Sequence, residues 1–316
     1  MRVLVHGGAG SRPDDPEGRR SVLVDAADAG SREEVPLDAV ETAINRLEAD
    51  PRFNAGVGSA VQSDGVIRTD AGIMTDDRRV GAACSMAGVE RAVSVARAVL
   101  EETPHVLVAG DRAVALAEAV GVETDVDCWT ERTRERWDAI DAPDPAATAD
   151  QLEWVRERFG RTDPDGRDSD GVTDRDHDTV GAVAFDGRRF AAATSTGGRW
   201  GALAGRVGDV PQVGSGFYCS PACAVSTTGA GEDIARTTLA RRTASHVERG
   251  LDAGAAADLA IEEFAELTGS SAGVIVVDAD GRYGSAFNSD AMQTAAASRT
   301  GARNRDVRDD RSTPPR

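Results

Sequence analysis

The sequence predicts an α/β protein in which mostly antiparallel sheets are covered by helices. Predicted strands come in pairs around short glycine turns in both halves of the chain, at Gly65, at Asp186-Gly187 and at Asp280-Gly281. Segments with apolar residues at helical spacing also occur in both halves. Because strands and helices do not simply alternate, a doubly wound parallel sheet is not expected.

The first half of the chain contains short strands and amphipathic helices. The helix at 37–49 is the clearest, because apolar residues recur on one face from Leu37 to Leu47 and Pro51 ends the pattern. A strand at 3–5 enters a glycine turn at 6–10, which His6 is expected to brace. The other predicted strands lie at 59–62, 66–74, 81–87 and 106–108, and the other helices at 19–29, 89–102, 112–120 and 130–159, the last broken by Pro143 and Pro145.

The segment 161–178 has a different character. It reads RTDPDGRDSDGVTDRDHD and holds no large apolar residue except Val172, so it cannot pack into a core. We expect an exposed linker there and, at 299–316, a polar, disordered tail. Between them we expect strands at 179–185, 189–196, 225–228, 273–278 and 281–287, helices at 232–249 and 254–267, and a glycine-rich stretch at 197–216.

The chain is strongly acidic, with a formal net charge of -18, and none of its 316 residues is lysine. Such a surface repels nucleic acid and anionic membranes, so neither is expected as a partner. The composition favours adaptation to high salt, although GC-rich codon bias would also remove lysine. Without lysine, a Schiff base to pyridoxal phosphate and a Walker A phosphate loop are excluded.

The cysteines and the N-terminus indicate an ordinary cytoplasmic protein. Cys84, Cys128, Cys219 and Cys223 match no zinc spacing and are expected to be buried thiols without a metal or disulfide role. The N-terminal sequence MRVLVHGGAG is interrupted by glycine too early for a signal peptide. No stretch approaches the roughly 18 apolar residues of a membrane span.

The most informative position is the junction between the linker and the next strand, Asp178-Thr179. A threonine hydroxyl is a weak nucleophile, but cleavage of the peptide bond before Thr179 would place a new α-amine within reach of that hydroxyl. An α-amine has a pKa of about 7.7–8.0 and can act as a general base near neutral pH, without histidine or metal. The alternative is that a β-branched residue simply begins a strand.

Three downstream clusters carry side chains suited to such a site. The TSTGG at 194–198 places hydroxyls at the end of a predicted strand. In GRVGD, Arg206 can fork onto a carboxylate and Asp209 can pair with an ammonium. The STTGAGE at 226–232 is a strand, a glycine turn and a helix N-terminus, where backbone N–H groups favour an oxyanion. Singly, each has an ordinary interpretation as an edge strand, a surface ion pair or a β-to-α turn.

In this order, the motifs HGGAG, FNAGxG, DTVGAVA, ATSTGG, GRVGD and TTGAGE resemble the plant-type L-asparaginase / isoaspartyl-peptidase family of N-terminal-nucleophile hydrolases. The similarity covers well over half of the chain, at 6–10, 37–74, 81–109, 178–232 and 273–288. It implies an αββα sandwich with mostly antiparallel sheets between helical layers. It also implies an autoprocessed enzyme that hydrolyses L-asparagine, β-aspartyl (isoaspartyl) peptides, or both, to release L-aspartate.

The resemblance implies a role for each matching residue. The chain would cleave itself between Asp178 and Thr179 into an α-subunit (1–178) and a β-subunit (179–316) of one domain, with Thr179 as the nucleophile. The other matches are Thr196 for the threonine that hydrogen-bonds the nucleophile, Arg206 for the clamp on the substrate α-carboxylate, Asp209 for the partner of the α-ammonium, Thr228 and Gly229 for the oxyanion hole, Gly231 for a backbone contact to the substrate amine, and Asn54 for an asparagine close to the site.

The resemblance also implies a structural sodium ion, although the reaction itself requires no cofactor. Backbone carbonyls would hold this ion, which suits a hard cation. The matching residues are Leu47, Glu48, Asp50, Phe53, Ala55 and Val57. Family analogy further implies a dimer of αβ heterodimers that acts on a small molecule or a short peptide.

One segment departs from the family pattern. Between TSTGG and GRVGD the family often has a lysine, whereas this chain has RWGALA. Trp200 in this segment is expected near the mouth of the site, where it would restrict the leaving group.

Three rival functions stay open at this point. The first is a glycosylasparaginase, which cleaves N4-(β-N-acetylglucosaminyl)-L-asparagine and shares His177-Asp178, but carries TSTNG where this chain has TSTGG. The second is a threonine-aspartase-like endopeptidase. The third is a non-catalytic binding protein, which would be expected to have lost the nucleophile or its substrate-binding residues.

Overall fold

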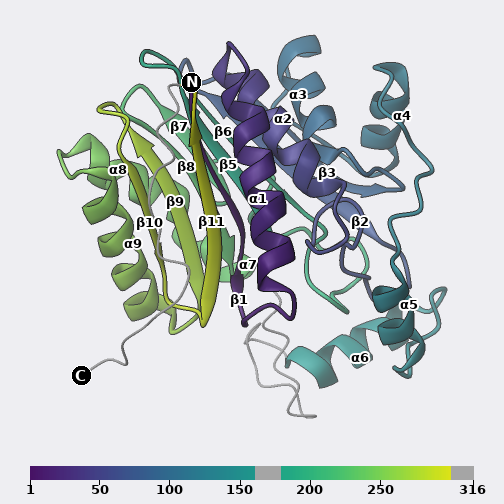
Figure 1. The fold of residues 1–316 in the computed structure, drawn as a ribbon. Coiled ribbons are helices and arrows are strands. Elements are labelled where there is room, and N and C mark those ends of the chain that lie inside the picture. Colours follow the sequence, from purple (N-terminus) through teal and green to yellow (C-terminus); the bar gives the residue numbers. More distant parts are fainter. Residues whose placement is uncertain (161–178, 300–316) are drawn as a thin grey trace.

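The structure of the protein, a computed structural model, describes residues 1–160 and 179–299 (Figure 1). The predicted linker at 161–178 and all but the first residue of the predicted tail lie outside the described residues. The described strands form a seven-stranded sheet in the order β11-β1-β5-β6-β2-β3-β4 and a four-stranded sheet in the order β10-β9-β8-β7. Their neighbours pair antiparallel, except β3 and β4, so the prediction of mostly antiparallel sheets is confirmed.

The strands of the described chain are β1 (Arg2–Gly10), β2 (Arg68–Thr75), β3 (Val80–Ala87), β4 (Leu107–Ala109), β5 (Val180–Phe185), β6 (Phe190–Thr196), β7 (Phe217–Ser220), β8 (Cys223–Gly229), β9 (Ala272–Asp278), β10 (Tyr283–Phe287) and β11 (Ala291–Ser298). Its helices are α1 (Pro16–Ser31), α2 (Pro36–Glu48), α3 (Ala92–Glu102), α4 (Asp111–Ala119), α5 (Glu131–Asp138), α6 (Thr148–Phe159), α7 (Gly231–Thr237), α8 (Leu239–Glu248) and α9 (Ala253–Thr268).

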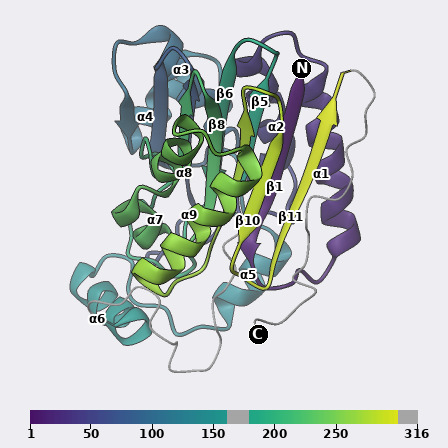
Figure 2. The same cartoon turned by 90° about the vertical axis from the view of Figure 1, so that its left-hand side faces the viewer.

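Helices contact each of the two sheets. The helices α1, α2 and α3 contact strands of the larger sheet, and α8 and α9 contact the smaller one (Figures 1 and 2). Between the sheets lies an apolar cluster drawn from both, including Leu4, Phe217 and Ile275. Large aromatic side chains are few, so small residues let the layers approach closely. Gly72 shows this, because a Cβ on it would lie 2.0 Å from the Phe217 ring.

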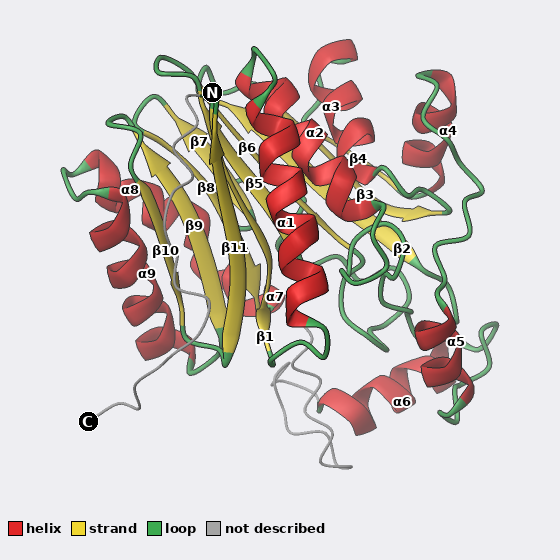
Figure 3. Ribbon diagram, viewed as in Figure 1, coloured by secondary structure: helices red, strands yellow, loops and turns green. Residues whose placement is uncertain are grey.

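Most predicted elements are present, with four corrections (Figure 3). The predicted glycine turn at 6–10 is part of β1, which runs from Arg2 to Gly10 with a bulge between His6 and Ala9. The predicted strand at 59–62 is reduced to an isolated bridge between Val61 and Ile67. The strands β7 and β11 were not predicted, because β7 has only four residues and β11 is rich in alanine, a weak strand former. The predicted helix at 232–249 is two helices, α7 and α8, separated by Thr238 in a left-handed conformation at φ 51°.

The break at Thr238 is explained by hydrogen bonds to a distant loop. The first N–H groups of α8 point to the glycine-rich loop that precedes β7: Ala240 donates to the Ser215 carbonyl at 3.2 Å and Arg241 to the Gly214 carbonyl at 2.8 Å. Tertiary contacts therefore satisfy donors that a continuous helix would satisfy internally. The consequence for the pocket is that α7, which carries Gly231 and Glu232, is a short helix that ends before α8 begins.

The two halves of the chain are interleaved in the larger sheet. Strand β1, from the first half, lies between β11 and β5, both from the second half. On its other edge β5 pairs with β6, which in turn pairs with β2. Thr179, directly before β5, therefore lies where strands from both halves alternate. No helix in the described part of the chain is long and apolar enough to cross a membrane.

Candidate active site

The hydroxyls of Thr179 and Thr196 lie side by side at the ends of two paired strands. The register of β5 with β6 pairs Val180 with Ser195, which brings Thr179 next to Thr196. The Thr179 hydroxyl donates to Thr196 Oγ1 at 3.1 Å, and Thr196 Oγ1 also accepts the Gly198 N–H at 3.1 Å. Thr179 is only 8% exposed, so its hydroxyl is held in one orientation before any substrate binds. Asp178 lies outside the described residues.

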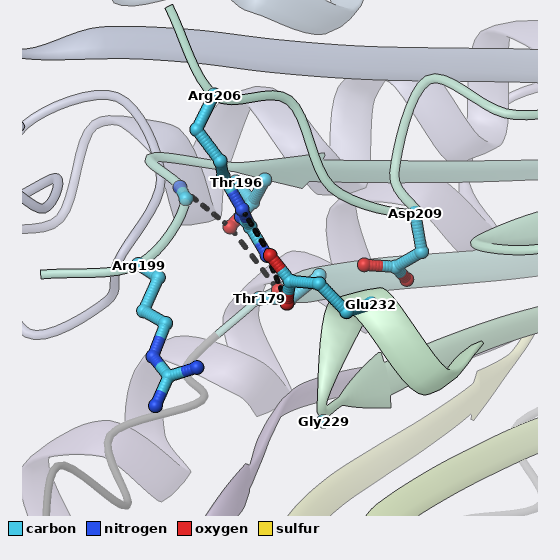
Figure 4. Close-up of a pocket in the computed structure, with 9 residues that line it drawn as sticks. Thr179, Thr196, Arg199, Arg206, Asp209, Gly229 and Glu232 are labelled. Atoms are coloured by element: carbon cyan, nitrogen blue, oxygen red, sulfur yellow. Dashed lines mark hydrogen bonds and ion pairs between the residues drawn. The ribbon is translucent and has the colours of Figure 1, made fainter. Parts of the chain in front are cut away.

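A pocket of about 320 Å³ that is open to solvent contains this hydroxyl pair (Figure 4). The residues that line it are Thr179, Thr196, Gly198, Arg199, Arg206, Asp209, Gly229, Gly231 and Glu232. They come from the ends of β5, β6 and β8, from the start of α7 and from the loop between β6 and β7. Of the residues predicted for the reaction and for substrate binding, only Thr228 and Asn54 do not line this pocket.

Arg206 and Glu232 form a bidentate ion pair in the pocket. Arg206 Nε donates to Glu232 Oε1 and Arg206 Nη2 to Glu232 Oε2, each at 2.7 Å. Burial alone would raise the pKa of Glu232, but the hydrogen bonds and charge of Arg206 lower it to about 2. Two N–H groups of Arg206 are thus already committed, which the sequence did not lead us to expect. The available signal was the acidic residue that directly follows Gly231 at a helix start.

Asp209 is a buried carboxylate prepared for a cation. It is 5% exposed, and Asp209 Oδ2 has no hydrogen-bond partner among the described residues. Burial raises its pKa to about 7, although the nearby Arg206 charge acts in the opposite direction. A Cβ at Gly231 would lie 2.8 Å from Asp209 Oδ1 and 2.9 Å from Arg206 Nη2. The glycine therefore leaves room beside both charged groups.

Thr228 and Gly229 lie where β8 turns into α7. Thr228 is fully buried, and its Oγ1 accepts the Ala9 N–H at 3.3 Å. The single hydroxyl hydrogen must therefore point away from Ala9. Gly229 lines the pocket at φ 135°, and a Cβ there would lie 2.5 Å from the Ser271 carbonyl, so only glycine fits. The Thr228 hydroxyl and the Gly229 N–H are donors of the kind an oxyanion requires.

Asn54 supports the pocket from behind. Its Nδ2 donates to the Gly198 carbonyl at 2.7 Å, and its Oδ1 accepts the Ala60 N–H at 2.8 Å. The Asn54 carbonyl accepts the Gly197 N–H at 2.8 Å. Asn54 thus fixes the turn that follows Thr196. The prediction placed it close to the active site, and the structure gives it a bracing position there.

A buried chain of polar groups, which we call the polar rung, lies behind the threonines: His6 on β1, Ser226 on β8 and Thr194 on β6. His6 Nε2 is 2.9 Å from Ser226 Oγ, which is 2.7 Å from Thr194 Oγ1, and Thr194 donates to the Gly216 carbonyl at 3.0 Å. The three side chains thus form a continuous polar chain that ends on a backbone carbonyl.

The polar rung ties together the strands that carry the predicted site. Burial lowers the pKa of His6 to about 3, with the Thr179 backbone acting in the opposite direction, so the ring is neutral and lies against the main chain of Thr179. Thr194 is two residues before Thr196, and Ser226 two before Thr228. Residues two apart share one face of a strand. The rung therefore fixes the relative positions of these threonines.

The segment predicted to bind sodium is a compact turn after α2. The Glu48 carbonyl accepts the Val57 N–H at 2.9 Å, and the Leu47 carbonyl accepts the Asp50 N–H at 3.2 Å. A Cβ on Gly58 would lie 2.7 Å from the Pro51 oxygen and 2.9 Å from the Phe53 oxygen. The carbonyls of Leu47 and Glu48 thus already accept backbone N–H groups within the turn.

The Glu48 side chain connects the same turn to β6. Its Oε1 accepts from the Ser195 hydroxyl at 2.6 Å and from the Val93 N–H at 3.0 Å. Burial raises the pKa of this carboxyl to about 8, although both hydrogen bonds act in the opposite direction. The described residues contain no group of three or more His, Cys, Asp or Glu side chains that could hold a metal ion. The four cysteines are buried and form no disulfide.

Trp200 does not lie where the sequence pattern placed it. It is 4% exposed and packs with Ala60, Val61 and Ile67 in a separate apolar cluster, with the Arg136 guanidinium 4.2 Å from its ring centre. It does not line the pocket, so the expectation that it restricts the leaving group is wrong. The adjacent Arg199 lines the pocket instead. Neighbouring residues of this loop point in opposite directions, which the sequence could not reveal.

The pocket at the ends of β5, β6 and β8 is small and strongly charged, and it contains two adjacent threonine hydroxyls. The sequence model that describes the asparaginase family matches residues 1–306, and the chain belongs to that family. Several relatives resemble it over nearly their whole length.

A plant-type L-asparaginase of Pyrococcus abyssi is 37% identical over 307 residues, which cover 93% of this chain and 95% of the relative. The plant-type L-asparaginase of Pyrobaculum calidifontis is 38% identical over 301 residues, covering 92% and 94% of the two chains. An isoaspartyl peptidase/L-asparaginase of Macaca fascicularis is 36% identical over 307 residues, covering 93% and 92%. The chain is thus an enzyme of the asparaginase / isoaspartyl peptidase family.

Proposed function

We propose that the chain cleaves itself before Thr179 and then hydrolyses L-asparagine and β-aspartyl peptides to release L-aspartate. The observation that carries this proposal is the Thr179 hydroxyl, fixed by Thr196 in a pocket that also contains Arg206 and Asp209. Relatives with both activities in their names support the choice of substrates. The enzyme would be an αββα N-terminal-nucleophile hydrolase, with helices of α1–α3 and α8–α9 as its outer layers.

Self-cleavage would begin with attack of the Thr179 hydroxyl on the carbonyl carbon of Asp178. The carbon–nitrogen bond breaks as an ester forms, and the nitrogen becomes the α-amine of Thr179. Water then hydrolyses the ester, which leaves a carboxylate on Asp178 and a free hydroxyl on Thr179. The new α-amine can take the proton from that hydroxyl during catalysis.

Substrate hydrolysis would use two sets of groups around the Thr179 hydroxyl, one that binds the amino-acid head and one that stabilises the oxyanion. Asp209 pairs with the α-ammonium of the aspartyl head, and Arg206 binds its α-carboxylate with N–H groups that Glu232 does not use. Thr179 Oγ1 attacks the side-chain carbonyl, while the Thr228 hydroxyl and the Gly229 N–H stabilise the oxyanion. Ammonia or an amine leaves, and water releases L-aspartate from the β-aspartyl ester.

Two further parts of the proposal concern stability rather than chemistry. As the family resemblance implies, a sodium ion would be held by backbone carbonyls of Leu47, Glu48, Asp50, Phe53, Ala55 and Val57 and would stiffen the turn next to Asn54. Two αβ units would associate into a dimer, as family analogy implies. Sedimentation of the processed protein tests the dimer, and thermal denaturation with sodium against a bulkier monovalent cation tests the ion.

Denaturing electrophoresis and mass spectrometry test the cleavage directly. Active protein should give two fragments, and the second should begin at Thr179. An unbroken polypeptide with full activity would refute the proposal, because the general base would be missing. A single band without activity would support the alternative of a binding protein on this fold.

Kinetics on three substrates test the chemistry. Processed protein should release aspartate from L-asparagine and from a β-aspartyl dipeptide. Turnover of N4-(β-N-acetylglucosaminyl)-L-asparagine at a higher kcat/KM than either would instead establish the glycosylasparaginase alternative. Because the surface is strongly acidic, each assay should be performed in both low and high salt.

A further inference from the structure

One side of the pocket is built around Arg199. Figure 4 shows Asp209 and Arg199 on opposite sides of Thr179, and both line the pocket. The Arg199 guanidinium carbon lies 4.3 Å from the centre of the Phe159 ring at the end of α6. Against the effect of burial, the hydrogen bonds and charge of Arg206, and then the charge of Arg199, lower the pKa of Glu232. The positive charges of Arg206 and Arg199 are therefore both felt at Glu232, inside the pocket.

The amino-acid head of the substrate fits on the Asp209 side. Asp209 Oδ1 and Arg206 Nη2 both lie within 3 Å of the position that a Cβ on Gly231 would occupy. An α-ammonium and an α-carboxylate are attached to one carbon, so they need partners that converge in this way. With the head there and its side-chain carbonyl at Thr179, the leaving group extends toward Arg199.

We propose that Arg199 binds the carboxylate of the departing amino acid and so makes β-aspartyl dipeptides with a free C-terminus the preferred substrates. This inference rests on the proposed function and names its substrate class. In such a dipeptide, the carboxylate is attached to the carbon next to the departing nitrogen. Asparagine releases ammonia, which has no group for Arg199 to bind, and an amidated dipeptide lacks the charge.

Phe159 prepares Arg199 for this contact. A guanidinium stacked on a ring donates its N–H groups in its own plane, at the edge of the stack, so stacking fixes the plane without using them. The α6 helix is itself anchored to the loop, because a Cβ on Gly201 would lie 2.8 Å from the Trp154 ring. An arginine held in this way loses little freedom when it forms two hydrogen bonds to a carboxylate.

The first test needs only the wild-type, processed enzyme and two substrates. We expect kcat/KM for β-aspartyl-leucine to exceed that for β-aspartyl-leucinamide by roughly tenfold to a hundredfold, the range for a charge-assisted hydrogen bond. The amide has the more weakly basic leaving amine, so intrinsic reactivity does not favour the acid. Equal values, or a preference for the amide, would overturn the inference.

The second test compares Arg199→Met with a matched control. Arg158→Met removes the arginine that lies 5.1 Å from the Trp154 ring, on α6 but outside the pocket lining. In Arg199→Met the acid-to-amide ratio should fall toward one, with a smaller loss for asparagine, and Arg199→Lys should be intermediate. The control should keep the wild-type ratio.

The outcomes separate the two proposals. An unchanged acid-to-amide ratio in Arg199→Met would refute the role of Arg199 while leaving asparagine hydrolysis intact. Absence of turnover of asparagine and of both dipeptides by processed wild-type enzyme would instead refute the proposed function. If Arg199→Met fails to fold or to cleave itself, the wild-type comparison still decides.

Discussion

Among the described residues, those that line the pocket all lie in the half of the chain that starts with Thr179. The half before Thr179 contacts them from behind: His6 through the polar rung, Asn54 through the turn at Gly198, and Phe159 through the Arg199 ring contact. The half before Thr179 thus positions the pocket, whereas the half that starts with Thr179 supplies the side chains that line it. Variants in the first half should change geometry, whereas variants in the second should remove a reacting or binding group.

The division matters because the proposed cleavage falls between the halves. The cut frees the N-terminus of β5 but removes none of its pairing with β1 or β6. The half that supports the pocket therefore remains in contact with the half that forms it. A new α-amine is gained without the loss of any described strand pairing.

Thr179→Ala should have the largest effect. Removal of the hydroxyl removes both the attacking atom of self-cleavage and the proposed nucleophile, so electrophoresis should show one band and turnover should be undetectable. Thr179→Ser is the informative partner, because it keeps a hydroxyl and should still yield two fragments. A cleaved and active Thr179→Ala protein would show that Thr179 is only the first residue of a strand.

In the second half of the chain, the sequence predicted which residues form the pocket more completely than it predicted how those residues are arranged in space. Glycine-rich motifs mark Thr196, Arg206, Asp209 and Gly229 in the sequence. In these motifs a hydroxyl or a charged residue lies at a fixed spacing from glycines, and glycines mark places where the backbone approaches another group closely. The pairing of Arg206 with Glu232 joins residues 26 apart, and no local pattern encodes it. Which of two neighbours, Arg199 or Trp200, faces the pocket depends on loop dihedral angles.

The first half was harder to interpret for a related reason. His6 was expected to brace a turn, whereas it lies within β1, where the pairing with β11 is interrupted by a bulge after it. The residues that it joins, Ser226 and Thr194, come from distant strands. Periodicity predicted the helix that became α2 because one face is consistently apolar. It could not predict β11, whose alanines carry little strand preference and gain their structure from pairing with β1.

Arg206→Lys should cause the next largest loss. Lysine cannot form the two-pronged contact with Glu232, so the half-buried Glu232 carboxylate loses a hydrogen bond and the substrate α-carboxylate loses its fork. We expect self-cleavage to continue while kcat/KM for asparagine falls roughly tenfold to a hundredfold, mainly through KM. Arg97→Lys, in the ion pairs of α3 with Asp38 and Glu41, is the control outside the pocket. Tight binding by Arg206→Lys enzyme would refute the carboxylate assignment.

The pH dependence of kcat/KM should reflect Asp209. Its pKa is raised from an ordinary 3.8 to about 7 by burial, so the carboxyl is neutral below that pH and cannot pair with an ammonium. Protonation of the Thr179 α-amine, whose ordinary pKa is about 7.7–8.0, also lowers kcat/KM. Below pH 7, loss of the Asp209 carboxylate should therefore add a further fall of about tenfold per unit in kcat/KM for asparagine. Because a bound ammonium stabilises the carboxylate, the corresponding fall in kcat should lie at lower pH. A flat kcat/KM between pH 5 and 7 would contradict this role.

Ser226→Ala should have a smaller effect that separates positioning from stability. It interrupts the polar rung and leaves His6 Nε2 and Thr194 Oγ1 without their shared partner, which should lower the free energy of unfolding by about 1–3 kcal/mol. Because Thr194 and Ser226 precede Thr196 and Thr228 by two residues, kcat should also fall several-fold. Ser289→Ala removes a buried hydroxyl bonded to the Ala291 carbonyl at 3.0 Å and should affect stability alone. Equal kcat in both variants would make the rung purely structural.

The smallest expected effect is that of the cut on the association of the halves. Strand β1 is held between β11 and β5, and β2 pairs with β6, so the first fragment cannot leave without breaking three rows of backbone hydrogen bonds. The fragments should therefore elute together in native size-exclusion chromatography and separate only in denaturant. Refolding should then be poor, because β1 must insert between strands of another chain. Dissociation in native buffer would contradict the interleaved sheet and, with it, the division of work between the two halves.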